Sequence, residues 1–180
     1  MKKGIWIKGA VLSLTILVLV MLTGAVFAEQ GNYEKILKLK DEIIKIQNQG
    51  KLGFRNFTLC SKIITMGNYV PLPEPKIKVG KKLLIYYEPA NVFTNTQGGR
   101  YEFWVTQDMF LFDEEGKLLF EKTKALSMHF NTATPLLDLY ITNTLTLTGL
   151  SAGKYTYKAV LHDVLKDSTA TKTIDFEIVE

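Results

Sequence analysis

The sequence predicts a mainly β protein of two packed antiparallel sheets, preceded by one short helix. From Thr58 to the end of the chain, apolar and polar residues alternate mostly with a period of two, which is typical of half-buried strands. Turn signals such as Asp-Glu-Glu-Gly at residues 113–116 interrupt these runs. Ahead of them, one stretch has helical spacing, NYEKILKLKDEIIKIQNQG at residues 32–50. Together these patterns favour a sandwich with a helical entry segment.

The N-terminus has the pattern of a secretory signal peptide. Three lysines precede an almost unbroken apolar run from Gly9 to Ala28, which ends with small or β-branched residues at Val26 and Ala28. The run is also long enough to cross a bilayer as a retained anchor. We therefore expect an exported protein, which is periplasmic, extracellular or membrane-anchored outside the cytoplasm. Its expected parts are a leader at 1–28, a helical segment at 29–50 and a sandwich domain at 51–180.

Charge and cysteine content narrow the functional classes. The leader holds three of the 22 basic residues and none of the 18 acidic ones, which leaves a net charge of +1 for the rest. Nucleic-acid binding needs a concentrated basic face, so we expect no nucleic-acid partner. Cys60 is the only cysteine, so no internal disulfide can form. We expect it to be a buried small apolar residue, with an intermolecular bridge or a reactive thiol as the alternative.

The helical stretch has both end signals. Asn32 can cap its start and Gly50 follows its end. One predicted face is apolar and consists of Ile36, Leu39, Ile43 and Ile46. Such a helix can lie on the domain, serve as a stalk or pair with a partner helix in a coiled coil. Because KILKLK also alternates, a strand is a further alternative.

Seven strands are expected near residues 58–65, 81–88, 101–112, 117–124, 138–148, 154–163 and 170–179. After the first, prolines at the alternate positions 71, 73 and 75 cannot donate regularly to a ladder, which predicts an edge or crossing segment. Residues 125–135 are expected to be irregular. The last two strands form a hairpin, in which the side chains of Asp163 and Asp167 can accept hydrogen bonds from local backbone amides at the turn.

The stretch GLSAGKYTY at residues 149–157 resembles the tyrosine corner of immunoglobulin and fibronectin-type-III domains. In that family a leucine-glycine crossover leads into the penultimate strand, and a tyrosine hydroxyl bonds back to the crossover backbone. The resemblance assigns these roles to Leu150, Gly153 and Tyr155. It places Tyr157 where antibody domains carry their second cysteine. The implied fold is a seven-stranded antiparallel immunoglobulin/fibronectin-III-like sandwich.

A wider resemblance extends across about 120 residues of the chain and rests on the stretches 66–92, 111–120 and 150–179. These look like a recurring pattern in uncharacterised exported bacterial proteins. The resemblance implies the sandwich and no activity.

The sequence shows no pattern of a catalytic or metal site. No serine stands in a Gly-x-Ser-x-Gly elbow, and His-x-x-x-His and Cys-x-x-Cys spacings are absent. No glycine-rich loop opens a helix. We therefore expect no catalytic residue, no metal and no cofactor, and hence no enzyme. Calcium on the acidic turns FDEEG or LHDVLKD is a minor alternative.

Aromatic residues supply the candidate binding surface. A bulge near Gln107 and Asp108 would turn Tyr101, Phe103 and Val105 inward together with Phe110 and Phe112, and leave Trp104 outward. An outward tryptophan can stack on a sugar ring or on a partner's anchor residue. The candidate surface consists of Trp104, Tyr101, Arg100 and Tyr86. The alternative is that Trp104 packs under the helix or a loop.

These observations predict a binding or assembly module of the cell envelope that acts through protein–protein interaction. The alternative is a carbohydrate-binding module that uses the aromatic residues around Trp104. The expected partner is an envelope protein or a surface polysaccharide. Contact with the membrane is expected only if the leader is retained.

Overall fold

The computed structural model describes residues 31–180, so the expected signal peptide lies outside the described residues. Residues 31–49 are helical, and ten strands follow, which confirms the mainly β class with a preceding helix. The chain divides into two compact units, Met1–Glu42 and Ile43–Glu180, and all ten strands of the described residues lie in the second. Within residues 31–180, no helix combines the length and apolarity needed to cross a membrane.

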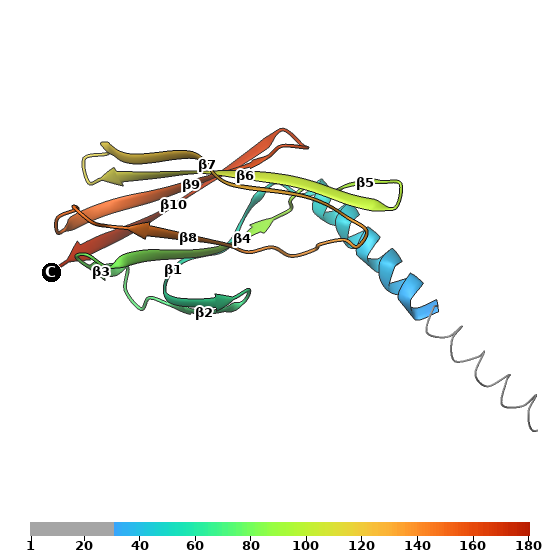
Figure 1. Cartoon of the computed structure of the whole chain (residues 1–180), viewed down its shortest axis with the longest axis horizontal. Coiled ribbons are helices and arrows are strands. Elements are labelled where there is room, and N and C mark those ends of the chain that lie inside the picture. The colour runs from blue at the N-terminus through green and yellow to red at the C-terminus, as the bar shows by residue number, and fades with distance from the viewer. Residues whose placement is uncertain (1–30) are drawn as a thin grey trace, which may run out of the picture. The chain divides into compact units, whose positions relative to one another are not determined.

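The strands form two sheets, which Figure 1 shows as two layers. Their bounds are β1 (Gly53–Thr65), β2 (Asn68–Pro71), β3 (Lys76–Lys78), β4 (Lys82–Ala90), β5 (Asn95–Gln97), β6 (Arg100–Asp113), β7 (Leu118–Thr132), β8 (Ile141–Thr146), β9 (Gly153–Asp163) and β10 (Ser168–Val179). The first sheet has the order β2-β1-β4-β8. The second has the order β3-β10-β9-β6-β5, and β7 pairs with β6.

The predicted number of seven strands is wrong, because three short strands add to the seven expected runs. They are β2, β3 and β5. β2 is an edge of the first sheet, whereas β3 pairs in parallel with β10 at an edge of the second. Pro73 and Pro75 lie in the link between β2 and β3, which passes from one sheet to the other. The predicted crossing segment is thus confirmed, and the prolines confine its pairing to sheet edges.

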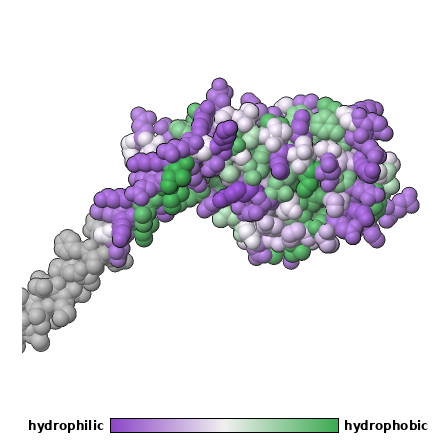
Figure 2. All heavy atoms as spheres, turned by 180° about the vertical axis from the view of Figure 1, so that it is seen from behind, coloured by the Kyte–Doolittle hydropathy of each residue, from purple (hydrophilic) through white to green (hydrophobic). Residues whose placement is uncertain are grey.

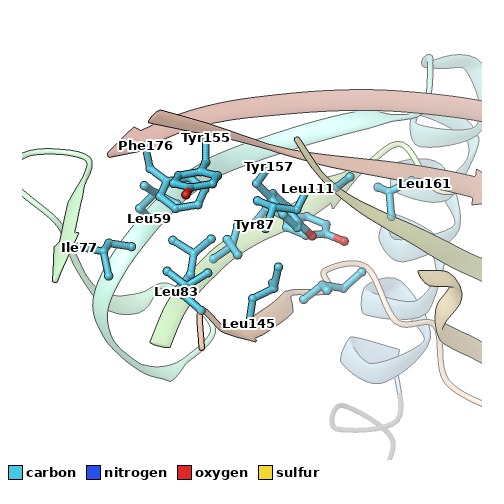
Figure 3. Close-up of a cluster of buried hydrophobic side chains, with 14 of the residues drawn as sticks. Leu59, Ile77, Leu83, Tyr87, Leu111, Leu145, Tyr155, Tyr157, Leu161 and Phe176 are labelled. Atoms are coloured by element: carbon cyan, nitrogen blue, oxygen red, sulfur yellow. The ribbon is translucent and has the colours of Figure 1, made fainter. Parts of the chain in front are cut away.

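The core lies between the inner faces of the two sheets (Figure 3). Alternate residues of the central strands supply it, among them Leu83, Ile85, Tyr87, Phe103, Val105, Leu111, Tyr155, Tyr157, Ala159, Leu161, Phe176 and Ile178. The rings of Tyr155 and Phe176 stack with their centroids 5.7 Å apart. Cys60 is buried and unpaired, and burial raises the pKa of its thiol. The prediction that Cys60 is a small buried residue is confirmed.

A polar network crosses the core from sheet to sheet. Tyr87 donates its hydroxyl to the Gln107 side-chain oxygen at 2.7 Å. The Tyr157 hydroxyl accepts from the side-chain amides of Gln107 at 3.1 Å and Asn143 at 3.0 Å. Burial raises the pKa of both phenols well above the ordinary tyrosine value. Because four strands contribute one residue each, the network fixes how β4, β6, β8 and β9 face one another.

The tyrosine corner has the hydrogen bond that the resemblance implies. Tyr155 donates its hydroxyl to the carbonyl oxygen of Ser151 at 2.9 Å. Leu150 packs against the core beside it. The backbone of Gly153 has φ +155° where β9 begins, a conformation that disfavours a residue with a Cβ. The corner therefore fixes the entry of β9 into the second sheet.

The end of the helix is anchored by side chains of the β unit. Ile44 is buried, Gln47 donates to the Leu137 carbonyl oxygen at 2.9 Å, and Asn48 exchanges two 2.9 Å hydrogen bonds with the backbone of Thr94. The Lys166 ammonium donates to the carbonyl oxygens of Asn48 at 2.6 Å and Gly50 at 3.0 Å. A cation is favourable there because the C-terminal carbonyls of a helix carry partial negative charge.

The predicted apolar stripe of the helix remains on the surface. Its members, Ile36, Leu39, Ile43 and Ile46, are 42–69% exposed. Figure 2 shows hydrophobic and hydrophilic atoms side by side along the helix. Packing of this stripe on the domain is therefore ruled out for Ile43 and Ile46, whereas Ile44 takes the buried position.

The predicted bulge lies in β7 and not in β6. The pairing of β6 with β9 runs without interruption from Val105 to Asp113. The side chains of β6 therefore alternate between the inner and outer faces without a shift along this stretch. β7 has its irregularity opposite Gln107 and Met109, where Lys124 has φ +47°. Phe110 and Phe112 consequently lie on the outer face, where the Lys158 ammonium is 4.3 and 5.1 Å from their ring centroids. The predicted irregular stretch 125–135 is instead strand up to Thr132.

Candidate functional site

The four residues of the predicted binding surface do not lie together. Tyr86 belongs to β4 of the first sheet, whereas Arg100, Tyr101 and Trp104 belong to β6 of the second. Tyr86 points away from the core, since its neighbours Ile85 and Tyr87 point into it. Tyr86 and Trp104 therefore lie on opposite outer faces of the sandwich. The predicted surface is wrong in combining them.

Tyr86 is also fully buried. Its ring stacks on Tyr69 at 4.1 Å and on Tyr140 at 5.9 Å. Its hydroxyl accepts from the Gly67 amide and donates to the Glu88 carboxylate, both at 2.8 Å. Burial raises its pKa to about 12. Tyr86 thus holds the β1–β2 turn against the first sheet and presents no free ring face.

Tyr101 is buried as well, because it shares the inward parity of Phe103 and Val105. This result removes it from the predicted binding surface. Arg100 is exposed, but its guanidinium donates to the side chain and the carbonyl oxygen of Asn131. Arg100 therefore fastens β6 to β7.

Trp104 lies half-buried on the outer face of the second sheet. Its indole stacks on His129 of β7 at 4.7 Å, and its Nε1–H donates to the Ser127 hydroxyl at 3.2 Å. His129 in turn contacts the Glu102 carboxylate at 2.8 Å. A stacking platform for a sugar needs an open ring face, and His129 occupies one face of Trp104. Trp104 thus lies on the outer face, where its indole and the polar side chains around it are already paired with one another.

A second histidine–carboxylate pair, which the sequence pattern did not predict, lies on the same face. His162 of β9 contacts Asp108 of β6 through Nε2 and Oδ2 at 2.8 Å. The two residues are 54 positions apart, and only the register of β6 with β9 brings them together. No motif in a single sequence encodes such a cross-strand pair. Among residues 31–180, no three metal-ligating side chains cluster in a way that could hold a metal ion.

Asp108 also holds the β7 bulge. Its Oδ1 accepts the backbone N–H of Lys124 at 2.7 Å, while Oδ2 contacts His162. Burial opposes the charge of Asp108, but the hydrogen bonds from Lys124 and His162 outweigh it and lower the pKa of the carboxyl. The carboxylate is therefore the common acceptor that joins β6, β7 and β9 at this point.

We expect Asp108 to make the protein acid-sensitive. Because its folded pKa is lowered, its contribution is present above the unfolded pKa of about 3.9 and is lost as the pH falls through the folded pKa. In urea unfolding monitored by circular dichroism, Asp108→Asn should lower the free energy of unfolding at pH 7. The difference from the native protein should then shrink towards pH 2–3. A difference that stays constant with pH would contradict this role.

An open groove lies on the side of the sandwich where β7 of the second sheet and β8 of the first sheet face each other without pairing. Its volume is about 350 Å³, and Met109, Leu111, Leu145 and Leu147 are among its apolar residues. Leu119 and Phe120 of β7 form its outer wall and are 38% and 40% exposed. Apolar side chains exposed along a groove are typical of interaction sites.

A second hollow of about 410 Å³ continues the groove and shares Leu119 and Leu150 with it. It is polar and is lined by Asp113, Glu114, Glu115 and Lys154 at the tyrosine corner. Lys154 pairs with Glu114 at 3.1 Å. The open side of the sandwich therefore has an apolar section followed by an acidic one. This side was not predictable from the sequence, since it arises from two strands that are not neighbours in any sheet.

No family model and no curated protein matches the chain. Several solved structures are similar to it at low identity, among them the following three. The alkylpurine DNA glycosylase AlkC of Pseudomonas fluorescens, bound to DNA with an abasic site analog, has a TM-score of 0.42 and 8% identity over 73% of this chain and 31% of its own. A family 123 glycoside hydrolase of Clostridium perfringens has a TM-score of 0.39 and 10% identity over 59% and 23%.

The third is a CARDB domain of Pyrococcus furiosus in complex with di-metal ions, with a TM-score of 0.33 and 12% identity over 72% of this chain and 86% of that domain. The chain spans less than a third of either enzyme. At these values no activity, ligand or metal is transferred to it.

The prediction that the chain is not an enzyme is corrected by this comparison. Two of the structures named above are enzymes, which contradicts that expectation, and their TM-scores of 0.42 and 0.39 assign no activity to this chain. Motif spacings along the chain could not reveal the pairs His162–Asp108 and His129–Glu102, because these pairs form across strands.

Proposed function

We propose that the chain is an exported binding domain that holds a protein partner at the cell envelope, on the open side between β7 and β8. The observation that carries the proposal is the groove with its apolar floor and the exposed wall of Leu119 and Phe120. Burying such side chains in an interface gains about 25 cal/mol per Å² of apolar surface. The fold of this module is proposed to be of the immunoglobulin/fibronectin-III type, as the corner at Tyr155 supports.

The N-terminal pattern supports export, and the resemblance to exported bacterial proteins supports a place in the envelope. A protein partner is favoured over a polysaccharide because of how the two surfaces differ. The groove offers unpaired apolar side chains, whereas the indole of Trp104 is engaged by His129 and Ser127.

Site-specific photo-crosslinking in the native envelope tests the proposal. A photoreactive phenylalanine analogue at Phe120 should give a discrete protein adduct, because this ring lies at the groove. The matched control is the same analogue at Phe130, which lies on the same strand, is 43% exposed compared with 40%, and does not line the groove. Adducts are detected as a mass shift on denaturing gels and identified by mass spectrometry.

Equal yields of adduct from Phe120 and Phe130 would indicate non-specific contact with neighbouring proteins and would contradict a binding site at the groove. No adduct from Phe120 over the background of an unirradiated sample would contradict the proposal.

A further inference from the structure

The free edge of β8 has none of the features that protect edge strands. β8 (Ile141–Thr146) pairs with β4 along one edge in an uninterrupted register, and no strand within residues 31–180 pairs with its other edge. Its residues Ile-Thr-Asn-Thr-Leu-Thr include no charge, proline or glycine. Natural edge strands are usually blunted by charges, bulges or prolines. β8 is therefore open to pairing with another strand.

The facing edge strand, β7, has two of these protective features, namely register irregularities and charged side chains. Its register is irregular between Gln107 and Met109 and again between Leu111 and Phe112 of its partner β6. It also carries Lys122 and Lys124, which lie at the first of these irregularities. Bulges and lysines are the usual means by which proteins prevent edge pairing. The contrast makes β8 the strand that can accept a partner.

We propose that the partner of the groove contributes an extended segment that pairs with β8 as an added strand. This inference rests on the proposed function, because it concerns the same groove. Side chains on one face of the added strand would enter the groove over Met109, Leu111 and Phe120, and those on the other face would continue the exposed row of Thr142, Thr144 and Thr146. The segment therefore alternates apolar residues with threonine or serine.

The charge of the groove further predicts an acidic residue in the partner's segment. Among the described residues that line it, Lys122 alone is charged. A carboxylate on the groove side of the added strand would pair with that ammonium. A second copy of this chain is a poorer occupant, because it would bring another Lys122 to the same side. β8 of a second copy also has no acidic residue.

The probe is the peptide Thr-Val-Thr-Val-Thr-Glu-Thr-amide with fluorescein attached to its N-terminal amine, titrated with the protein by fluorescence anisotropy. Two N-methylated forms distinguish strand pairing from contact through side chains. One carries methyl groups on the amides of valine and glutamate, and the other on those of the inner threonines. Because alternate amides point to opposite edges of a strand, one form should lose at least tenfold in affinity and the other should retain binding.

Reversing the charge at Lys122 tests whether the glutamate of the peptide pairs with this residue. Lys122→Glu should weaken binding of the glutamate peptide about two- to fivefold and strengthen binding of its lysine counterpart by a similar factor. Lys172→Glu is the matched control, because it makes the same change on an exposed residue of β10 outside the groove.

Two results would overturn strand addition. If both methylated peptides bind as well as the parent peptide, the backbone edge of β8 is not used. If the parent peptide shows no binding at its highest soluble concentration, the segment does not add as a strand. In either case the Phe120 crosslink remains an independent measure of the proposed function. If the protein is dimeric by light scattering and Thr144→Lys makes it monomeric, the strand that pairs with β8 comes from a second copy of the chain. That result would overturn the proposed partner segment.

Discussion

Asp163→Ala is expected to lower the free energy of unfolding by about 3 kcal/mol, because it removes a buried acceptor of two backbone hydrogen bonds. Asp163 is 1% exposed. Its carboxylate accepts the N–H of Phe93 at 2.6 Å and that of Lys166 at 3.1 Å. Hydrogen bonds to a charged acceptor contribute about 1.5–3 kcal/mol each, and a buried amide left without a partner adds its desolvation cost.

The loss should extend beyond the turn after β9. Phe93 precedes Thr94, which pairs with Asn48 at the helix end, and Lys166 caps the same helix end. Asp163 therefore organises two of the segments that hold residues 43–49 against the sheets. For a protein of this size, a loss of about 3 kcal/mol corresponds to a fall in Tm of roughly 6–12 °C. Hydrogen exchange should show faster exchange of the Phe93 and Thr94 amides.

Asp167→Asn is the matched control. Asp167 lies in the same turn, is exposed and has φ +49°, which asparagine tolerates. Its substitution should change the free energy of unfolding by less than about 0.5 kcal/mol. The loss in free energy of unfolding for Asp163→Asn should lie between those of the other two variants. The asparagine side chain keeps one acceptor oxygen but turns an N–H donor towards the other backbone N–H. If Asp163→Ala is no more destabilising than Asp167→Asn, the buried carboxylate is not an organising element.

The elements whose structure depends on local pattern were predictable. The alternation of Tyr155, Tyr157, Ala159 and Leu161 identified the inner face of β9, and all four are buried. Asp113 and Gly116 form the predicted turn, in which the Gly116 amide donates to the Asp113 carbonyl oxygen at 3.1 Å. Such features need only side-chain parity and the backbone freedom of glycine, both of which are read from neighbouring residues.

Features that depend on which strands meet were not predictable. The parity of β6 is maintained by its register with β9, so Phe110 and Phe112 lie outside although the aromatic run suggested a bulge. The predicted binding surface was wrong for the same reason, since no pattern in the chain places Tyr86 and Trp104 in different sheets. The groove likewise arises from the meeting of two edge strands, and neither strand shows in its own sequence that the other lies opposite.

Tyr157→Phe is expected to cost about 2–3 kcal/mol, although it removes a single oxygen atom. The hydroxyl is fully buried and accepts from the amides of Gln107 and Asn143. Phenylalanine would leave the Asn143 amide without this acceptor, and Gln107 would keep only its bond from Tyr87. Urea unfolding measured by circular dichroism gives the difference.

The position gives this network a clear structural role. The resemblance to immunoglobulin domains implies that Tyr157 corresponds to the second cysteine of the disulfide between the sheets of antibody domains. Here the bond from Asn143 of β8 to Tyr157 of β9 joins the two sheets instead. A hydrogen-bonded link needs no oxidising compartment, but it stabilises the fold only if every buried partner is satisfied.

Two variants separate this role from a general loss of packing. Tyr155→Phe removes the corner hydroxyl two residues away, which makes one bond to Ser151, and should cost about 1 kcal/mol. Asn143→Leu combined with Tyr157→Phe should recover part of the loss, because it replaces an unpaired amide with an apolar group of similar size. If Tyr157→Phe costs no more than Tyr155→Phe and the double variant restores nothing, the link between the sheets comes from apolar packing alone.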